Sequence, residues 1–259
     1  MSTTYIQYEV EERIATIRLN RAEKRNALNP EMIRDLTAAL WRASDDSAVK
    51  VIVLQAEGSA FSAGADLAYL QQLQQNSYSE NLDDSLLLKN LYTSILRIPK
   101  VVIAQVEGHA IAGGCGLATA CDIIFAVPEA LFGYTEVKLG FVPALVSCLL
   151  MRKTSETIVK RILFTGELFN AETALQYNLI TFVTNKEEIR QKVRNFALDL
   201  CESSSGNALA VTKKLINETT FASLETSLTA AAALNAEVRQ SDDFKKGIGD
   251  FLEKKKTSW

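Results

Sequence analysis

Two loops rich in glycine and alanine are the first places where chemistry could occur. They cover residues 59–67 (SAFSAGADL) and residues 107–117 (EGHAIAGGCGL), and each separates an apolar strand pattern from a helical pattern. Small residues let a ligand or another backbone approach the main chain closely, and the first turn of a helix carries N–H groups without intrahelical partners. Two such N–H groups from different loops could stabilise an oxygen that becomes negative during a reaction. The same composition also fits simple packing of helix against sheet.

Glu136, near the end of a predicted strand, is a candidate for proton transfer. Burial would raise the pKa of its carboxyl toward the range that suits a general acid or base. A solvated or salt-bridged carboxylate is the ordinary alternative at such a position. His109, the single histidine, lies four residues before Gly113 and is more simply a packed or exposed bystander. One histidine also excludes a multi-histidine metal site.

The elements that must position these residues alternate between strands and helices. Asn29 and Pro30 fit the N-cap and first turn of a helix. Predicted strands cover residues 6–10, 14–19, 51–54, 101–106 and 123–126, and predicted helices cover residues 30–44, 85–95 and 114–121. Such repeated strand–strand–helix units indicate an α/β core of stacked turns.

After residue 186 the pattern is almost purely helical. Candidate helices cover residues 189–201, 208–216, 224–237 and 242–254, separated by breaks rich in serine, glycine and asparagine. The chain contains no long low-complexity linker, so we interpret this tail as a helical subdomain of the same fold. The predicted division is residues 1–190 for the core with the active site and residues 191–259 for the helical subdomain.

Composition narrows the class of protein. The 259 residues are 47% hydrophobic and 23% charged with a net charge of −3, which is typical of a soluble globular protein and gives no basic field for nucleic acid or anionic membrane. No apolar run approaches the roughly 20 residues of a membrane span, and the first residues lack a signal-peptide pattern. The four cysteines form no CxxC pair. We expect a cytoplasmic, reduced, metal-free protein that binds neither nucleic acid nor membrane.

Several segments, in order along the chain, resemble the crotonase (enoyl-CoA hydratase/isomerase) superfamily. They are IATIRLNRAEKRNALN (14–29), FSAGAD (61–66), EGHAIAGGCGLATACDI (107–123), FGYTEVKLGFVPA (132–144) and DDFKKGIGDFLEKKK (242–256). The resemblance therefore covers the whole chain. It implies a crotonase-like α/β spiral of β-β-α units, a C-terminal helical trimerisation region, and a homotrimer or dimer of trimers.

The same resemblance implies a coenzyme A thioester as substrate, with no cofactor apart from the coenzyme A of that substrate. It implies that the backbone N–H groups of Ala65 and Gly113 form the oxyanion hole for the thioester carbonyl and that Glu136 transfers protons. Residues implied at or near the substrate are Lys24, Ala63, Asp66, Leu67, Gly114, Tyr134, Phe251 and Lys254. A helix cap is the simpler role for Asp66, and a solvated loop charge is the alternative for Lys24.

One position departs from the family pattern. Hydratases of this family commonly use two glutamates, and the first of these positions is Gly116 here. Glu136 is then the only proton-transfer group that the motifs support. A single carboxylate suits hydration, but it also suits Δ3-Δ2 double-bond isomerisation. Decarboxylation and a non-catalytic binding or scaffold role are further alternatives.

The residues of four segments favour hydration over the other reactions. The segments GADLAYLQQL (64–73), NLDDSLLLKNLY (81–92), GGCGL (113–117) and TEVKLGFVPALVS (135–147) look like the bacterial methylglutaconyl-CoA hydratase branch. The reaction implied is hydration of 3-methylglutaconyl-CoA to 3-hydroxy-3-methylglutaryl-CoA, a step of leucine degradation. The sequence leaves open what replaces a glutamate at Gly116: another side chain, a water molecule or the substrate's own carboxylate.

Overall fold

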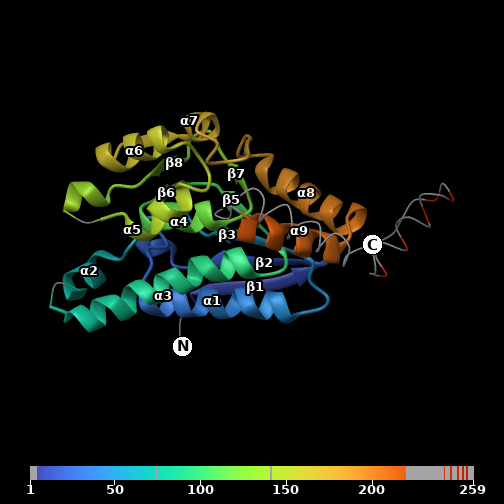
Figure 1. Ribbon diagram of the computed structural model, residues 1–259, viewed down its shortest axis with the longest axis horizontal. Coiled ribbons are helices and arrows are strands. Elements are labelled where there is room, and N and C mark those ends of the chain that lie inside the picture. The colour runs from blue at the N-terminus through green and yellow to red at the C-terminus, as the bar shows by residue number, and fades with distance from the viewer. Residues whose placement is uncertain are drawn as a thin grey trace.

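The computed structural model describes residues 5–73, 75–140 and 142–219, together with positions 242, 246, 250, 253 and 255. Two sheets form its centre (Figure 1). The larger sheet has the order β1 (Ile6–Glu11), β2 (Ile14–Leu19), β3 (Val51–Ala56), β5 (Val101–Val106), β7 (Ile123–Ala126) and β10 (Phe182–Val183). The smaller sheet has the order β4 (Ala60–Ser62), β6 (His109–Ile111), β8 (Leu131–Gly133) and β9 (Leu168–Asn170). Strands β1 and β2, and strands β8 and β9, pair antiparallel, and the other pairs are parallel.

The helices follow the strands in a regular order. They are α1 (Pro30–Asp45), α2 (Leu67–Leu73), α3 (Tyr78–Arg97), α4 (Gly113–Ala120), α5 (Ala144–Leu150), α6 (Glu156–Thr165), α7 (Ala171–Gln176), α8 (Ile189–Ser203) and α9 (Gly206–Thr219), with 3-10 turns η1 (Ala22–Lys24) and η2 (Glu136–Leu139). Three times the chain runs from the larger sheet to the smaller sheet and then into helices, at β3–β4, β5–β6 and β7–β8. This arrangement confirms the predicted spiral of β-β-α units.

Local chemistry explains the elements that the sequence predicted. Glu12 and Arg13 adopt φ angles of 48° and 68°, as the favoured two-residue turn of a β-hairpin requires, so β1 and β2 pair along their whole length. Asn29 caps α1 through its side chain, which accepts a hydrogen bond from the Met32 N–H at 2.9 Å. Pro30 then occupies the first turn, as predicted.

Other elements differ from the prediction. Helix α3 begins at Tyr78, seven residues before the predicted start, because Ser77 and Glu80 form a capping box that starts it earlier. The three-residue strands β4 and β6 were missed, since a strand that short inside a glycine-rich loop shows no alternation. Their pairing turns out to be what aligns the two loops.

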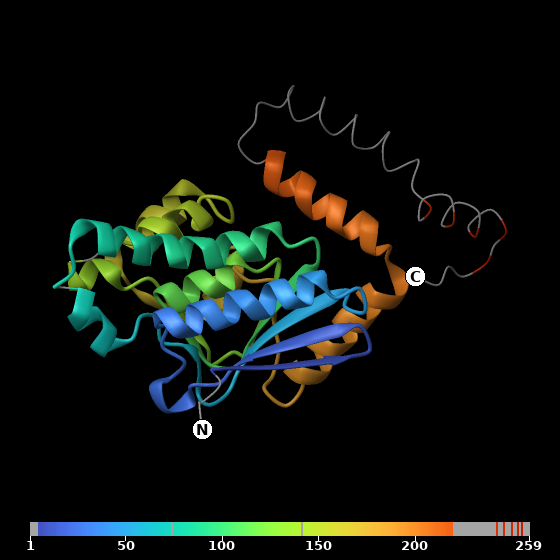
Figure 2. The ribbon, with the colours of Figure 1, turned by 90° about the horizontal axis from the view of Figure 1, so that it is seen from below.

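The larger sheet is covered on both faces. Helix α1 packs against β1 and β2 on one face, and α3 lies beside α1 (Figure 2). Helix α8 crosses strands β2, β3, β5 and β7 on the other face and buries every fourth residue there, namely Ile189, Val193, Ala197 and Cys201. A boundary at residue 190 would therefore fall at the start of a helix that packs on the core.

The predicted helices at residues 189–201 and 208–216 correspond to α8 and α9. The candidates at residues 224–237 and 242–254 lie outside the continuously described ranges. The division into core and helical subdomain remains a prediction. No helix of the described part is both long and apolar enough to cross a membrane.

Candidate active site

The two glycine-rich loops lie directly against each other. A Cβ atom at Gly64 would stand 2.9 Å from the Ile111 carbonyl oxygen and 3.5 Å from the Gly113 nitrogen. A Cβ atom at Gly114 would stand 2.5 Å from the carbonyl oxygen of Ser62. Only glycine allows backbones to approach so closely, so Gly114 is required here for packing between the loops. Its predicted contact with substrate stays a prediction.

Ala65 forms a short parallel β-bridge with Leu28, which connects the first loop to the residues before α1. Leu28 N–H donates to the carbonyl of Gly64 at 2.7 Å, and Asp66 N–H donates to the carbonyl of Leu28 at 3.0 Å. Both bonds use the neighbours of Ala65, so its own N–H takes no part in the bridge. The side chain of Ala65 is exposed, which leaves this stretch of backbone accessible.

Gly113 is the first residue of α4, where N–H groups have no intrahelical partner. The preceding Ala112 has φ 49° and ψ −123°, a backbone conformation that costs a non-glycine residue about 1–3 kcal/mol. Two hydrogen bonds hold it: Ala112 N–H donates to Gly133 O at 2.7 Å, and Gly116 N–H donates to Ala112 O at 3.0 Å. This strained peptide fixes the direction of the Gly113 N–H at the positive end of the α4 dipole.

Glu136 begins η2 directly after β8. Its Oε2 atom is buried and has no hydrogen-bond partner among the described residues. Burial raises the pKa of the Glu136 carboxyl, and a hydrogen bond from its own backbone opposes this only in part. The charge of Glu136 also raises the pKa of Tyr92 and of Cys115, after burial as the larger cause. The charge of the carboxylate thus acts on Tyr92, which bonds to the Gly113 carbonyl, and its buried oxygen has unused hydrogen-bonding capacity.

Asp66 supports the first loop with both carboxylate oxygens. Oδ1 accepts hydrogen bonds from the N–H groups of Ala68 (2.9 Å) and Tyr69 (3.3 Å) at the start of α2, and Oδ2 pairs with Arg21 at 2.6 Å. Burial raises the pKa of Asp66, but the Arg21 and backbone hydrogen bonds outweigh it, so the pKa is lowered overall. The carboxylate caps a helix and braces the loop, which is the simpler of the two roles that the sequence allowed.

Asn26 is a bracing residue that sequence reasoning did not single out. It is fully buried, and its side chain bonds to Arg21 N–H (2.8 Å) and to the carbonyls of Glu57 (2.7 Å) and Ala60 (2.8 Å). Ser62 Oγ donates to the Asn26 carbonyl at 2.8 Å. Its φ of 52° lies in the left-handed region, which asparagine tolerates better than most residues, but its contacts with distant segments leave no local sequence signal. Asn26 thereby joins the loop at residues 20–26 to the first glycine-rich loop.

Tyr134 corrects one expectation. It is completely buried, and its hydroxyl lies 2.7 Å from Thr119 Oγ1. Burial raises its pKa well above the ordinary value. In this structure Tyr134 is therefore a core residue that supports β8 and α4, because the space around its hydroxyl is filled by protein.

The structure gives positions for three of the other residues predicted at or near the substrate. Lys24 is exposed on η1, in keeping with either a phosphate contact or a solvated charge. Ala63 has an exposed side chain, and its N–H donates to the Arg25 carbonyl at 3.0 Å. Leu67 begins α2. Two predicted residues lie outside the described part of the chain, Phe251 and Lys254.

His109 and Cys115 take structural positions. His109 is exposed, and its Nδ1 accepts a hydrogen bond from the Leu131 N–H at 3.1 Å. Burial raises the pKa of Cys115 to about 12, so its thiol stays protonated and unreactive at neutral pH. Neither residue adds a nucleophile or a base to the site.

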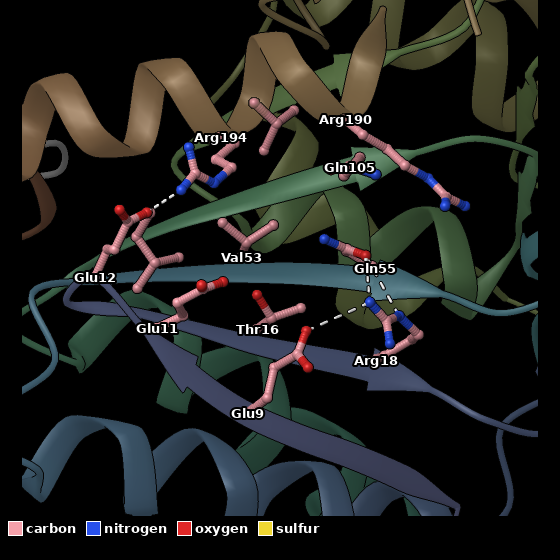
Figure 3. Close-up of a pocket in the computed structure, with 12 residues that line it drawn as sticks. Glu9, Glu11, Glu12, Thr16, Arg18, Val53, Gln55, Gln105, Arg190 and Arg194 are labelled. Carbon is pink, nitrogen blue, oxygen red and sulfur yellow. Dashed lines mark hydrogen bonds and ion pairs between the residues drawn. The ribbon is translucent and has the colours of Figure 1, made fainter. Parts of the chain in front are cut away.

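A cavity lies between the larger sheet and α8 (Figure 3). The arginines that line it form ion pairs with nearby carboxylates. Arg194 pairs with Glu12, and Arg18 pairs with Glu9 at 3.6 Å. Arg190 pairs at 3.1 Å with Glu107, which Figure 3 does not draw. None of the residues that line this cavity belongs to the glycine-rich loops. We therefore assign the candidate chemistry to the loops and Glu136.

Comparisons with known proteins identify the family of the chain. A family model described as enoyl-CoA hydratase/isomerase matches residues 9–259. A Thermus thermophilus protein that bears the name of a provisional enoyl-CoA hydratase is 39% identical over 242 residues, covering 93% of this chain and 95% of its own length. The crotonyl-CoA hydratase of Syntrophomonas wolfei is 31% identical over 265 residues, covering 100% of this chain and 99% of its own length.

Solved structures agree as well. The crystal structure of an enoyl-CoA hydratase from Mycobacterium smegmatis superposes with a TM-score of 0.93 at 26% identity and covers 98% of both chains. The match thus extends over nearly the whole length of both chains. The chain belongs to the enoyl-CoA hydratase/isomerase family.

Proposed function

We propose that this protein hydrates an α,β-unsaturated acyl-CoA thioester, with Glu136 as the general base and acid and with the N–H groups of Ala65 and Gly113 as oxyanion donors. The observation that carries the proposal is the buried Oε2 of Glu136, which has no hydrogen-bond partner among the described residues. A desolvated carboxylate with a raised pKa suits proton transfer. Two backbone N–H groups from adjacent loops would stabilise a developing oxyanion that they both contact.

The reaction follows from these groups. Glu136 accepts a proton from water as the water oxygen bonds to the β-carbon, and the electrons of the double bond move to the thioester oxygen as an enolate. Ala65 and Gly113 stabilise that negative oxygen through their N–H groups. Glu136 then returns the proton to the α-carbon, so that one water molecule has been added in total. No step needs a metal or a cofactor beyond the coenzyme A of the substrate.

The acyl group is a finer proposal. The sequence segments favour 3-methylglutaconyl-CoA, and hence a step of leucine degradation. Against this, the described side chains within 4 Å of a Cβ at Gly113 include Leu28 and Leu88, and such apolar walls suit a short uncharged chain such as crotonyl. A substrate with a second carboxylate would need a hydrogen-bond donor or a cation to meet it.

A panel of thioesters tests both the proposed hydration and the identity of the acyl group. The purified protein is mixed with 3-methylglutaconyl-CoA, crotonyl-CoA and a 3-enoyl-CoA, and the loss of conjugated-thioester absorbance is followed together with product mass. We expect a product heavier by one water molecule, and the faster of the two conjugated substrates identifies the acyl group. Turnover of the 3-enoyl-CoA to its conjugated isomer, without added water on any substrate, would instead identify an isomerase, which a single carboxylate also permits.

Assembly and location are separate proposals. The family resemblance supports a homotrimer or a dimer of trimers, and the composition supports a location in the cytoplasm. Light scattering after size-exclusion chromatography distinguishes the two assemblies, because their masses differ by a factor of two.

A further inference from the structure

Tyr92 reaches from α3 into the first turn of α4. Its hydroxyl donates a hydrogen bond to the carbonyl oxygen of Gly113 at 2.8 Å, and its side chain is buried. A Cβ atom at Gly113 would stand 3.5 Å from this hydroxyl oxygen. Tyr92 therefore contacts the residue whose N–H is proposed to bind the thioester oxygen.

The same ring fills the space beside Gly116. A Cβ atom at position 116 would stand 2.6 Å from Tyr92 Oη, 3.0 Å from Tyr92 Cζ and 2.6 Å from Val146 Cγ1. Real Cβ atoms essentially never come so close to other atoms. Position 116 is thus closed to any side chain while Tyr92 and Val146 stay in place.

We propose that Tyr92 is a positioning residue that takes the place of a side chain at position 116 and holds Gly113 by its carbonyl, so that the N–H on the other side of the same residue faces the thioester carbonyl. Ala112, just before Gly113, is strained, so the first turn of α4 needs contacts on both sides to stay in this conformation. The Gly133 carbonyl binds Ala112 on one side, and the Tyr92 hydroxyl binds Gly113 on the other.

The chemistry of the hydroxyl fits a donor. Burial, and then the charge of Glu136, raise the pKa of Tyr92, so the group stays protonated and keeps donating to Gly113. Tyr92 adds no second base to the site, and both proton transfers fall to Glu136. In this chain, the Tyr92 ring therefore occupies the space beside position 116, where hydratases of the family commonly carry a glutamate.

The inference rests on the proposed oxyanion hole, and it rests on the proposed hydration only where turnover is measured. Tyr92→Phe keeps the ring that fills the space beside Gly116 and removes only the hydrogen bond. The probe is butyryl-CoA, which has no double bond to hydrate, and the readout is the infrared stretching frequency of its bound thioester carbonyl. We expect the shift to lower frequency seen with the wild-type protein to shrink in Tyr92→Phe, with the dissociation constant of butyryl-CoA unchanged within about threefold.

Turnover gives a second readout. Loss of an oxyanion donor outright lowers kcat by about 10²–10³, and loosening one should cost less, about tenfold, with little change in KM. Tyr8→Phe is the matched control, since it removes another buried hydroxyl, on edge strand β1, that has no partner among the described residues. It should leave the carbonyl frequency and kcat at wild-type values. An unchanged carbonyl frequency in Tyr92→Phe overturns the inference.

Gly116→Ala tests the steric half of the inference. In a helix this change normally stabilises a protein, whereas the contacts at 2.6 Å predict a lower melting temperature and a smaller carbonyl shift. A more stable Gly116→Ala variant with the full carbonyl shift would contradict the close fit. If the wild-type protein hydrates no thioester but Tyr92→Phe still reduces the carbonyl shift, the hydratase proposal fails and the role of Tyr92 stands.

Discussion

At the scale of residues, the site depends on one carboxylate in an environment that desolvates it. Glu136 has a buried oxygen without a partner among the described residues, and an unmet buried acceptor costs free energy in the absence of substrate. A bound water that donates to this oxygen would recover that cost while being oriented for attack. The same desolvation raises the pKa of the carboxyl, which makes it a better base than an exposed glutamate.

The raised pKa gives a pH dependence with a definite sign. Hydration needs the ionised form of Glu136, so kcat/KM should fall as the pH drops through a value above the ordinary 4.5 of a glutamate. Protonation of Asp66 should cause no additional fall in kcat/KM in that pH range, because the pKa of Asp66 is lowered. A rate profile from pH 4 to pH 9, with butyryl-CoA binding measured alongside as the control, checks this. A profile that stays flat down to pH 4.5 would contradict the assignment.

The sequence predicted some of these residues and missed others for a physical reason. The sequence predicts Ala65, Gly113 and Glu136 as site residues, because they lie in contiguous segments that resemble a known family. Tyr92 and Asn26 act through contacts with segments distant in sequence. On its helix, Tyr92 has the pattern of an ordinary core aromatic, and no local feature marks its contact with Gly113.

At the scale of elements, the loop at residues 20–26 braces the first glycine-rich loop. Arg21 and Asp66 form an ion pair at 2.6 Å with side chains 12% and 9% exposed, so the pair is shielded from solvent. Arg21 also donates to the carbonyl of Ala27 at 3.0 Å. Breaking this brace should loosen the backbone that carries the Ala65 N–H.

Arg21→Met should therefore lower the free energy of unfolding by about 2–3 kcal/mol, because a buried carboxylate loses a charged hydrogen bond. Urea denaturation followed by circular dichroism measures the loss. Arg190→Met is the matched control, since its ion pair with Glu107 has an arginine that is 77% exposed, and it should cost less than about 1 kcal/mol. Equal losses in the two variants would show that Arg21 does not brace the loop.

Element prediction followed the strength of the local signal. The paired strands β1 and β2 and helix α1 have clear periodicity and caps, and the prediction placed each end within one residue, at Glu11 and Asp45. Strands β4 and β6 have three residues each, too few for a period to show. Their existence depends on the parallel pairing between the two loops, which is a property of the fold.

At the scale of the whole molecule, a buried lysine attaches helix α9 to the core. Lys213 Nζ donates to the carbonyls of Ile95 (2.8 Å) and Lys100 (2.9 Å) and to Asp122 Oδ2 (2.7 Å). Its side chain is 7% exposed. Three acceptors around one ammonium group offset its desolvation and join α9 to the end of α3 and the start of β5.

Lys213→Met should lower the free energy of unfolding by about 3–5 kcal/mol, since it leaves Asp122 without its cation. The neighbouring Lys214→Met is the control, because the Lys214–Glu218 pair is 63% and 61% exposed with a separation of 4.0 Å, and its loss should cost about 0.5 kcal/mol or less. Guanidinium denaturation of both variants compares them. If the two variants lose the same amount, Lys213 does not attach α9.

The architecture as a whole was predicted through the resemblance rather than through periodicity. Periodicity indicated an α/β core of stacked turns, and the ordered family segments implied a spiral of β-β-α units, which the structure builds from two sheets. The tethering of α9 by Lys213 could not be predicted, since lysine is ordinarily a surface residue.

The most direct test of the central claim is Glu136→Gln, which keeps the size of the side chain and removes its ability to transfer protons. The measurement is kcat for hydration of the best substrate in the thioester panel, together with the dissociation constant of butyryl-CoA. The account predicts that kcat falls by about 10²–10⁴ while the dissociation constant stays within about threefold. Full hydration activity in Glu136→Gln would contradict it and would move the base to another residue.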